Sequence, residues 1–113
     1  MTDAVGTLYS EDPPLFLART PHGHGCPKEI EVDASAAGFK KCELFQLDNI
    51  SVALTPDVPA IAYCQGTPLR NEIEARESDG LRRATEAASE AIRARYGPGP
   101  IEGRISAVVV SAE

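Results

Sequence analysis

The longest regular pattern along the chain is helical. Between residues 81 and 96 apolar side chains recur every three or four positions, which predicts an amphipathic helix with one buried face. The run Gly97-Pro98-Gly99-Pro100 follows and ends this helix. Shorter stretches with the same spacing, or with proline and capping residues at their start, predict helices over 2–9, 12–17, 27–37, 58–65 and 68–76.

A different period begins at Phe39, where apolar positions alternate with polar ones. Phe45 and Leu47 share one face, whereas Ile50 and Val52 fall in the opposite phase. We expect a bulge or bend near Asp48, because one extra residue there would bring the two halves of the strand onto the same side.

The chain ends in a second strand, over 101–112. Ile105, Ala107 and Val109 alternate with Val108 and Val110, so this strand is apolar on both faces and needs cover on both sides. The predicted fold is therefore α+β, in one domain over residues 1–113: two long antiparallel strands at about 39–54 and 101–112, a helical insertion between them and short helices before. Two strands alone make a marginal sheet, so a partner strand has to come from elsewhere.

The sequence around Gly66 predicts a tight corner between two helices. Gly66 is suited to end one helix in the left-handed conformation, Thr67 to cap the next, and Pro68 to occupy its first turn. We expect this corner to hold Tyr63, Cys64, Gln65 and Arg70 close together.

Composition and charge exclude several classes of function. The net charge is −6, and arginines in the second half alternate with glutamates, so a nucleic-acid partner is not expected. No apolar run approaches the roughly twenty residues of a membrane span, and polar residues follow Met1, where a secretory leader would be apolar. Three cysteines without a CxxC pair fit a reducing cytoplasm.

Few side chains form a pattern that indicates chemistry. His22, His24 and Cys26 could hold a transition metal, or could simply belong to a polar loop. Cys64 could be a nucleophile beside one of these histidines, or a small buried thiol. No phosphate-binding, dinucleotide-binding, serine-hydrolase or zinc-protease motif is present.

Arg70 offers a second pair of alternatives. It could bind a carboxylate or phosphate near the helix N-terminus, or it could pair with Glu74 one turn later. The candidate ligand-facing residues are Tyr63, Gln65, Thr67, Arg70 and His22.

Several segments, in this order, resemble the C-terminal portion of a bacterial class I S-adenosylmethionine-dependent methyltransferase. The segment from Cys64 to Arg76, reading CQGTPLRNEIEAR, is the most specific. The others are Asp12-Pro13-Pro14 with FLARTPHG from Phe16 to Gly23, AAGF from Ala36 to Phe39, and GPGPIEGRI from Gly97 to Ile105.

The resemblance implies that the two strands correspond to the sixth and seventh of the family's sheet, with the last strand flanked on both sides. The helices between them would be an insertion that covers the substrate. The family's first βα unit, with its glycine-rich cofactor loop, is not represented, so the isolated chain is expected to bind no cofactor and to transfer no methyl group. We assign no catalytic, cofactor-binding or metal-binding residue.

Three hypotheses follow for function. The chain is a methyltransferase-related C-terminal domain without activity of its own, or one part of a split methyltransferase that binds S-adenosylmethionine once a partner chain completes it. Alternatively it is a small-molecule or protein-binding module that uses the surroundings of Tyr63, Gln65 and Arg70. We also expect a homodimer through the exposed strand at residues 105–110.

Overall fold

The computed structural model describes all 113 residues and contains six helices and one two-stranded antiparallel sheet. The predicted α+β class is confirmed, with two long antiparallel strands and a helical insertion between them. The elements are α1 (Thr2–Leu8), α2 (Phe16–Arg19), α3 (Pro27–Ala36), β1 (Cys42–Ala53), α4 (Asp57–Gly66), α5 (Leu69–Arg76), α6 (Gly80–Tyr96) and β2 (Ile101–Ala112).

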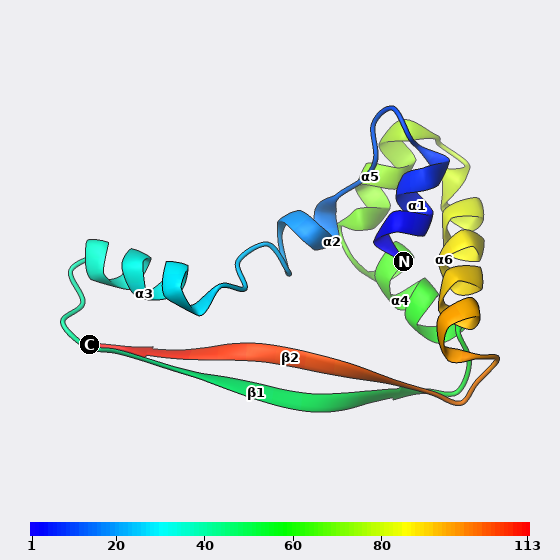
Figure 1. The fold of residues 1–113 in the computed structure, drawn as a ribbon. Coiled ribbons are helices and arrows are strands. Elements are labelled where there is room, and N and C mark those ends of the chain that lie inside the picture. The colour runs from blue at the N-terminus through cyan, green and yellow to red at the C-terminus, as the bar shows by residue number, and fades with distance from the viewer.

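Five helices pack into a cluster at one end of the molecule, and the sheet extends away from it as a long ribbon (Figure 1). Helices α1, α4 and α5 contact α6, and α2 contacts α5. Alanines at positions 60, 84 and 88 are fully buried and allow close approach between α4 and α6. The residues of the core are Val5, Leu17, Ala60, Cys64, Leu69, Ile73, Ala84 and Ala88. Every one of them lies on a helix, and Ile101, at the near end of β2, is the only residue of the ribbon that is buried.

Strand pairing in the ribbon is unbroken from Cys42 opposite Ala112 to Ala53 opposite Ile101. The bulge predicted near Asp48 is wrong, because Asp48 pairs directly with Ser106 in this continuous register. Without an extra residue, alternate side chains keep pointing to opposite faces. The apolar positions of β1 therefore change face midway along the strand.

Both faces of the ribbon are open to solvent along its middle. Phe45 and Ile50 lie on opposite faces, and their side chains are 58% and 59% exposed. Leu47, Val52 and Ile105 are also about half exposed or more. The expectation that the last strand needs cover on both sides is therefore not met within this chain.

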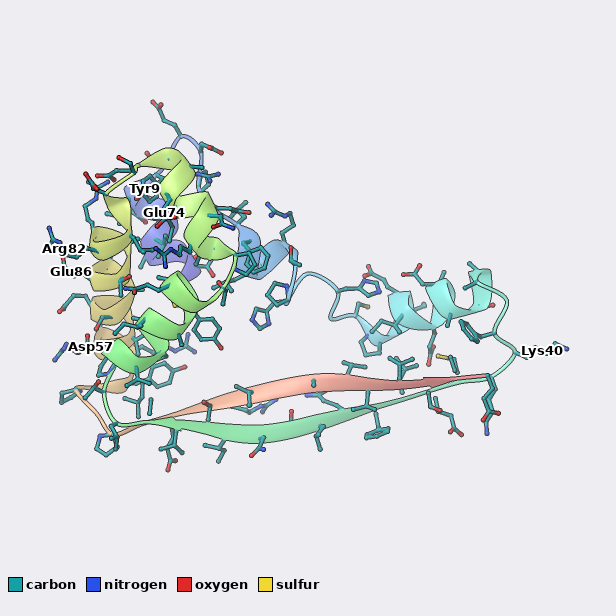
Figure 2. The ribbon with its side chains drawn as sticks, turned by 180° about the vertical axis from the view of Figure 1, so that it is seen from behind. Tyr9, Lys40, Asp57, Glu74, Arg82 and Glu86 are labelled. Atoms are coloured by element: carbon teal, nitrogen blue, oxygen red, sulfur yellow. The ribbon has the colours of Figure 1, made fainter.

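Helix α3 lies over the end of the ribbon that is distant from the helical cluster, where it contacts β1 and where Cys42 and Leu44 are half-buried (Figure 1). The same end is closed by backbone hydrogen bonds. The N–H groups of Lys40 and Lys41 donate to the Glu113 carbonyl over 2.7 and 3.1 Å, and the Glu113 N–H donates to Lys41 over 2.9 Å. Lys40 accordingly lies at the tip of the ribbon (Figure 2).

Glycines follow the ends of two helices, as the sequence predicts. Gly97 directly follows α6 with a φ angle of 87°, and Gly38, two residues beyond the end of α3, has a φ angle of 95°. Asp57, which directly precedes the helix predicted over 58–65 and is of a residue type suited to cap it, does not cap α4. It is the first residue of that helix, and its carboxylate accepts a hydrogen bond from the Ser89 hydroxyl on α6.

The whole molecule is less compact than a chain of this size usually is. It measures 49 × 32 × 19 Å and its radius of gyration is 16.9 Å, compared with about 13 Å for a typical globular domain of this length. Its accessible surface is 7634 Å², whereas a folded monomer of this mass exposes about 6,000 Å². None of the helices combines the length and apolar composition that a membrane crossing requires.

Candidate functional site

The corner between α4 and α5 is held by Thr67. Its hydroxyl donates a 2.6 Å hydrogen bond to the Tyr63 carbonyl and accepts a 3.2 Å hydrogen bond from the Leu69 N–H. One side chain therefore satisfies the last turn of α4 and the first turn of α5. The predicted capping contribution of Thr67 is confirmed.

The predicted left-handed end at Gly66 is wrong. Gly66 is the last residue of α4 and its φ angle is not positive, whereas Thr67 is extended, with φ −124° and ψ 168°. The chain turns because Thr67 leaves the helical region and Pro68 then re-enters it. Glycine is therefore not required at position 66 by the backbone conformation.

The side chains around this corner point into different surroundings. Tyr63 lines a cavity beside the ribbon, Gln65 lines a separate depression, and Cys64 lies in the core between them. Arg70 forms an ion pair with Glu74, with 3.0 Å between Nε and Oε1. This is the second of the two alternatives considered for Arg70, in which it pairs within its helix and binds no ligand. The expectation that the corner gathers these four residues is therefore wrong, because consecutive positions on one helix face different directions.

The glycine-rich loop places its histidines at the surface. His22 is exposed, and the Nε2 atom of His24 lies 3.3 Å from an Asp33 carboxylate oxygen on α3. Cys26 is exposed at the start of α3. No group of three or more histidine, cysteine or carboxylate side chains is placed to hold a metal ion.

Cys64 is a buried thiol in the helical core. The residue has no exposed surface, and its Sγ atom lies 4.0 Å from the Ala84 carbonyl oxygen. Burial raises the pKa of this thiol, because the thiolate would lose its hydration. The structure thus agrees with the interpretation of Cys64 as a packing residue.

Gln65 lies in an open depression between α4, α5 and α6 that carries mostly polar side chains, four of them acidic. Gln65 donates a 3.2 Å hydrogen bond to Thr85, and Arg82 is paired with Glu86 over 2.8 Å. Figure 2 shows Arg82 and Glu86 on α6, with Asp57 at the start of α4. The basic group is therefore already neutralised, and the rim presents no unpaired cation to a ligand.

A second hollow, of about 260 Å³, lies where the near end of the ribbon meets α4 and α6. Pro59 and Tyr63 of α4 lie four residues apart on one helical face, and Ile92 and Tyr96 of α6 do the same. The floor on the ribbon side comes from residues of both strands. They are Ser51, Ala53, Ile101, Gly103 and Ile105, which share one face of the sheet.

Charged groups stand at this hollow as well. Arg95 lines it, and the Arg95 guanidinium lies 5.4 Å from the centre of the Tyr96 ring. Glu102 and Arg104 also border the hollow, but they alternate with Ile101, Gly103 and Ile105, so their side chains project from the other face of the ribbon. We refer to this hollow, lined by α4, α6 and the near end of the ribbon, as the ribbon-base cavity.

Of the candidate ligand-facing residues predicted from the sequence, only Tyr63 lies at this cavity. Arg95 and Tyr96 were missed because they end a long helix whose charge pattern is typical of a solvated, salt-bridged face. Ile101 and Ile105 were missed because a strand pattern does not tell which end of a strand meets a helix. The helical spacing of Ile92 and Tyr96 was the one available signal, and the same spacing is typical of ordinary packing.

Comparison of the chain with protein-family models, with curated proteins and with solved structures gave no match.

Proposed function

We propose that this chain is a methyltransferase-related C-terminal region that transfers no methyl group alone and whose ribbon pairs with strands supplied by a cofactor-binding half. The observation that carries the proposal is the bare ribbon β1–β2, with apolar side chains open to solvent on both faces. Sheets buried on both faces have strands of this kind. The sequence resemblance suggests which sheet this is, because it implies that β1 and β2 correspond to the sixth and seventh strands of the methyltransferase sheet.

The antiparallel pairing of β1 with β2 supports this assignment. The resemblance implies an antiparallel last strand with a neighbour on each side, and here β2 has β1 on one side and no neighbour on the other. An unpaired edge presents a row of backbone N–H and C=O groups to an incoming strand. The cofactor-binding half would take that position, and S-adenosylmethionine would bind there only after the sheet is complete.

Three free cysteines are compatible with a reducing compartment, and we include the cytoplasm in the proposal.

The exposed surface of the chain also suits pairing with a second copy of the same chain when the cofactor-binding half is absent. The accessible surface of the chain is about 1,600 Å² larger than that of a typical monomer of this mass. A standard interface buries about 800 Å² on each partner. We therefore propose that isolated chains form a homodimer through the ribbon.

Calorimetry with S-adenosylmethionine tests the first proposal. We expect no micromolar binding by the isolated chain, and binding by the complex with a polypeptide that carries the glycine-rich cofactor loop. Micromolar binding by the isolated chain would overturn it. A co-purified chain that lacks this loop, or a complex that still fails to bind the cofactor, would also contradict the proposal.

Light scattering at high micromolar concentration tests the homodimer. We expect a dimeric mass for the natural sequence and a monomeric mass for Phe45→Lys with Ile50→Lys, which puts a charge on each open face of the ribbon. Val58→Lys is the matched control, because Val58 is an exposed apolar residue of α4 outside the ribbon. A monomeric mass for the natural sequence would contradict the homodimer without affecting the cofactor experiment.

A further inference from the structure

The floor of the ribbon-base cavity is part of a longer face of the ribbon. Ser51 and Gly103 line the cavity and share one face of the sheet. Strand alternation places Phe45 and Leu47, nearer the tip, on that same face, where each is 58% exposed. Helix α3 does not cover them, because it packs where Leu44 is half-buried, on the opposite face. We refer to the side that carries Ser51 and Phe45 as the cavity face.

The two faces differ in chemistry along the middle of the ribbon. The opposite face carries the hydrogen-bonded side chains of Gln46, Asp48 and Ser106 there. The cavity face has a single polar side chain, Asn49, in the same stretch. Its other side chains are apolar: Phe45, Leu47, Ile105, Ala107 and Val109. Burial of exposed apolar surface favours association, so the cavity face is the better suited of the two.

We infer that the cavity faces of two copies of this chain pack together, and that Phe45 of each copy fills the ribbon-base cavity of the other. This rests on the proposed homodimer and specifies its interface. Phe45 is the only aromatic residue of the ribbon. The cavity has a volume of about 260 Å³, and one of about 150 Å³ holds a benzene ring. The rings of Tyr63 and Tyr96 line it and can contact the incoming ring edge to face.

The spacing along the ribbon allows both contacts at once. Phe45 and Ser51 are six residues apart, which corresponds to about 20 Å along a strand. A twofold axis that crosses the ribbon midway, near Asp48, exchanges these two positions between the copies. Antiparallel packing of two cavity faces therefore brings each Phe45 to the cavity of the other copy and gives a closed dimer.

Charge complementarity favours the same arrangement. Arg95 lines the cavity and, unlike six of the eight arginines, pairs with no carboxylate. Glu43 lies two residues from Phe45 on the cavity face and contacts only the exposed Lys41, over 3.4 Å. An exposed pair of this kind contributes little to stability. Antiparallel packing directs the tip of each ribbon toward α6 of the other copy, so Glu43 approaches the Arg95 of the second copy.

Sedimentation equilibrium of the full chain, which measures the dimer dissociation constant, tests the inference. Phe45→Ala should weaken the dimer about a hundredfold, because two equivalent contacts are lost and each contributes about tenfold. Ile50→Ala is the matched control, because Ile50 is equally exposed on the opposite face. It should change the dissociation constant by less than about threefold.

Gly103→Leu closes the cavity without removing any side chain from the interface. A Cβ added at Gly103 meets no atom within 4 Å and its φ angle is not positive, so this variant is expected to fold. Its side chain would occupy the space that Phe45 of the second copy needs. The dimer should therefore weaken as much as in Phe45→Ala, with the helical circular dichroism of the natural chain retained.

Charge reversal gives a readout that a mere loss of stability would not. Arg95→Glu and Glu43→Arg should each weaken the dimer, because each places like charges at the contact between copies. The two changes together should restore it, because the charges are opposite again.

The outcomes separate this interface from the homodimer itself. A natural chain that stays monomeric at high micromolar concentration would contradict both. A dimer that Phe45→Ala leaves intact, that Ile50→Ala weakens equally, or that the double charge reversal does not restore would keep the homodimer and overturn the interface. Native mass spectrometry that finds a small molecule or a different polypeptide bound in place of the second copy would also overturn it.

Discussion

At the scale of single residues, the middle of the ribbon is held by a polar contact between its strands. The Gln46 amide donates 2.9 Å hydrogen bonds to an Asp48 carboxylate oxygen and to the Ser106 hydroxyl. Hydrogen bonds from Gln46 and Ser106 lower the pKa of the Asp48 carboxyl, with Arg104 adding a favourable charge. These groups lie at the point where the apolar side chains of β1 change from one face of the ribbon to the other. The hydrogen bond from Gln46 to Ser106 therefore links the two strands where a continuous row of apolar side chains is interrupted.

The lowered pKa of Asp48 fixes the sign of a pH dependence. A carboxyl whose folded pKa is below the unfolded value of about 3.9 stabilises the fold above that pH and loses the contribution as the pH falls through the folded value. We expect Gln46→Ala to raise the Asp48 pKa toward its ordinary value, measured from the carboxyl carbon signal. Gln65→Ala, remote from the ribbon, should leave it unchanged, and an equal pKa in both variants would contradict the contact.

Cys64 gives a second prediction at this scale. Because its thiol is buried and its pKa is raised, it should react with Ellman's reagent only when the core opens. In a variant with Cys26→Ser and Cys42→Ser, we expect labelling at least about a hundredfold slower than that of Cys26 in a variant with Cys42→Ser and Cys64→Ala. Comparable rates would mean that Cys64 is accessible and would reopen its interpretation as a nucleophile.

At the scale of elements, the helix ends differ in what they require of glycine. Gly97 follows α6 with φ 87°, which other residues adopt only with strain. Gly66 ends α4 without a positive φ, and a methyl group added at its Cα would meet only open space. A tight corner can thus be formed by threonine and proline alone. The glycine of the corner is a tolerated residue and not a conformational requirement.

Two alanine substitutions separate these cases. Gly66→Ala should raise the free energy of unfolding by about 0.4–1 kcal/mol, because it restricts the unfolded chain without strain in the native state. Gly97→Ala should lower it by about 1 kcal/mol or more, because alanine is strained at this φ angle. Urea denaturation of both variants measures the difference, and the opposite order would contradict the described ends of α4 and α6.

At the scale of the whole molecule, stability is divided unequally between the helical cluster and the ribbon. The residues of the core cluster all lie on helices, while the ribbon, apart from the buried Ile101, carries apolar side chains that contact solvent. Burial of such side chains against another surface is the main favourable contribution still available to this chain. We therefore expect any association to involve the ribbon, and folding to depend mainly on the helices.

A pair of isoleucines tests this division. Ile73 is fully buried in the cluster, so Ile73→Ala should lower the free energy of unfolding by about 2–5 kcal/mol. Ile50 is 59% exposed on the ribbon, so Ile50→Ala should change it by less than about 1 kcal/mol at low micromolar concentration. Urea denaturation followed by helical circular dichroism measures both, and equal losses would show that the ribbon is part of the folded core.

Much of the local structure could be predicted from the sequence because it depends on neighbours in the chain. The spacing of Leu81 to Tyr96, the proline at position 27 and the glycine at 97 each specify a helix or its end through contacts within a few residues. The alternation of apolar side chains over residues 101–112 specified a strand for the same reason. The alternative that paired Arg70 with Glu74 also needed only helical spacing.

The sequence by itself determined the α+β class, the two long strands and the capping by Thr67, because these follow from periodicity and local hydrogen bonding. Only the tertiary structure decided that the strands pair without a bulge, that Tyr63 and Gln65 lie in different hollows, and that Tyr63 and Tyr96 meet at one cavity. These features depend on strand register and on the packing of segments distant in the chain, and neither is encoded by spacing along one element.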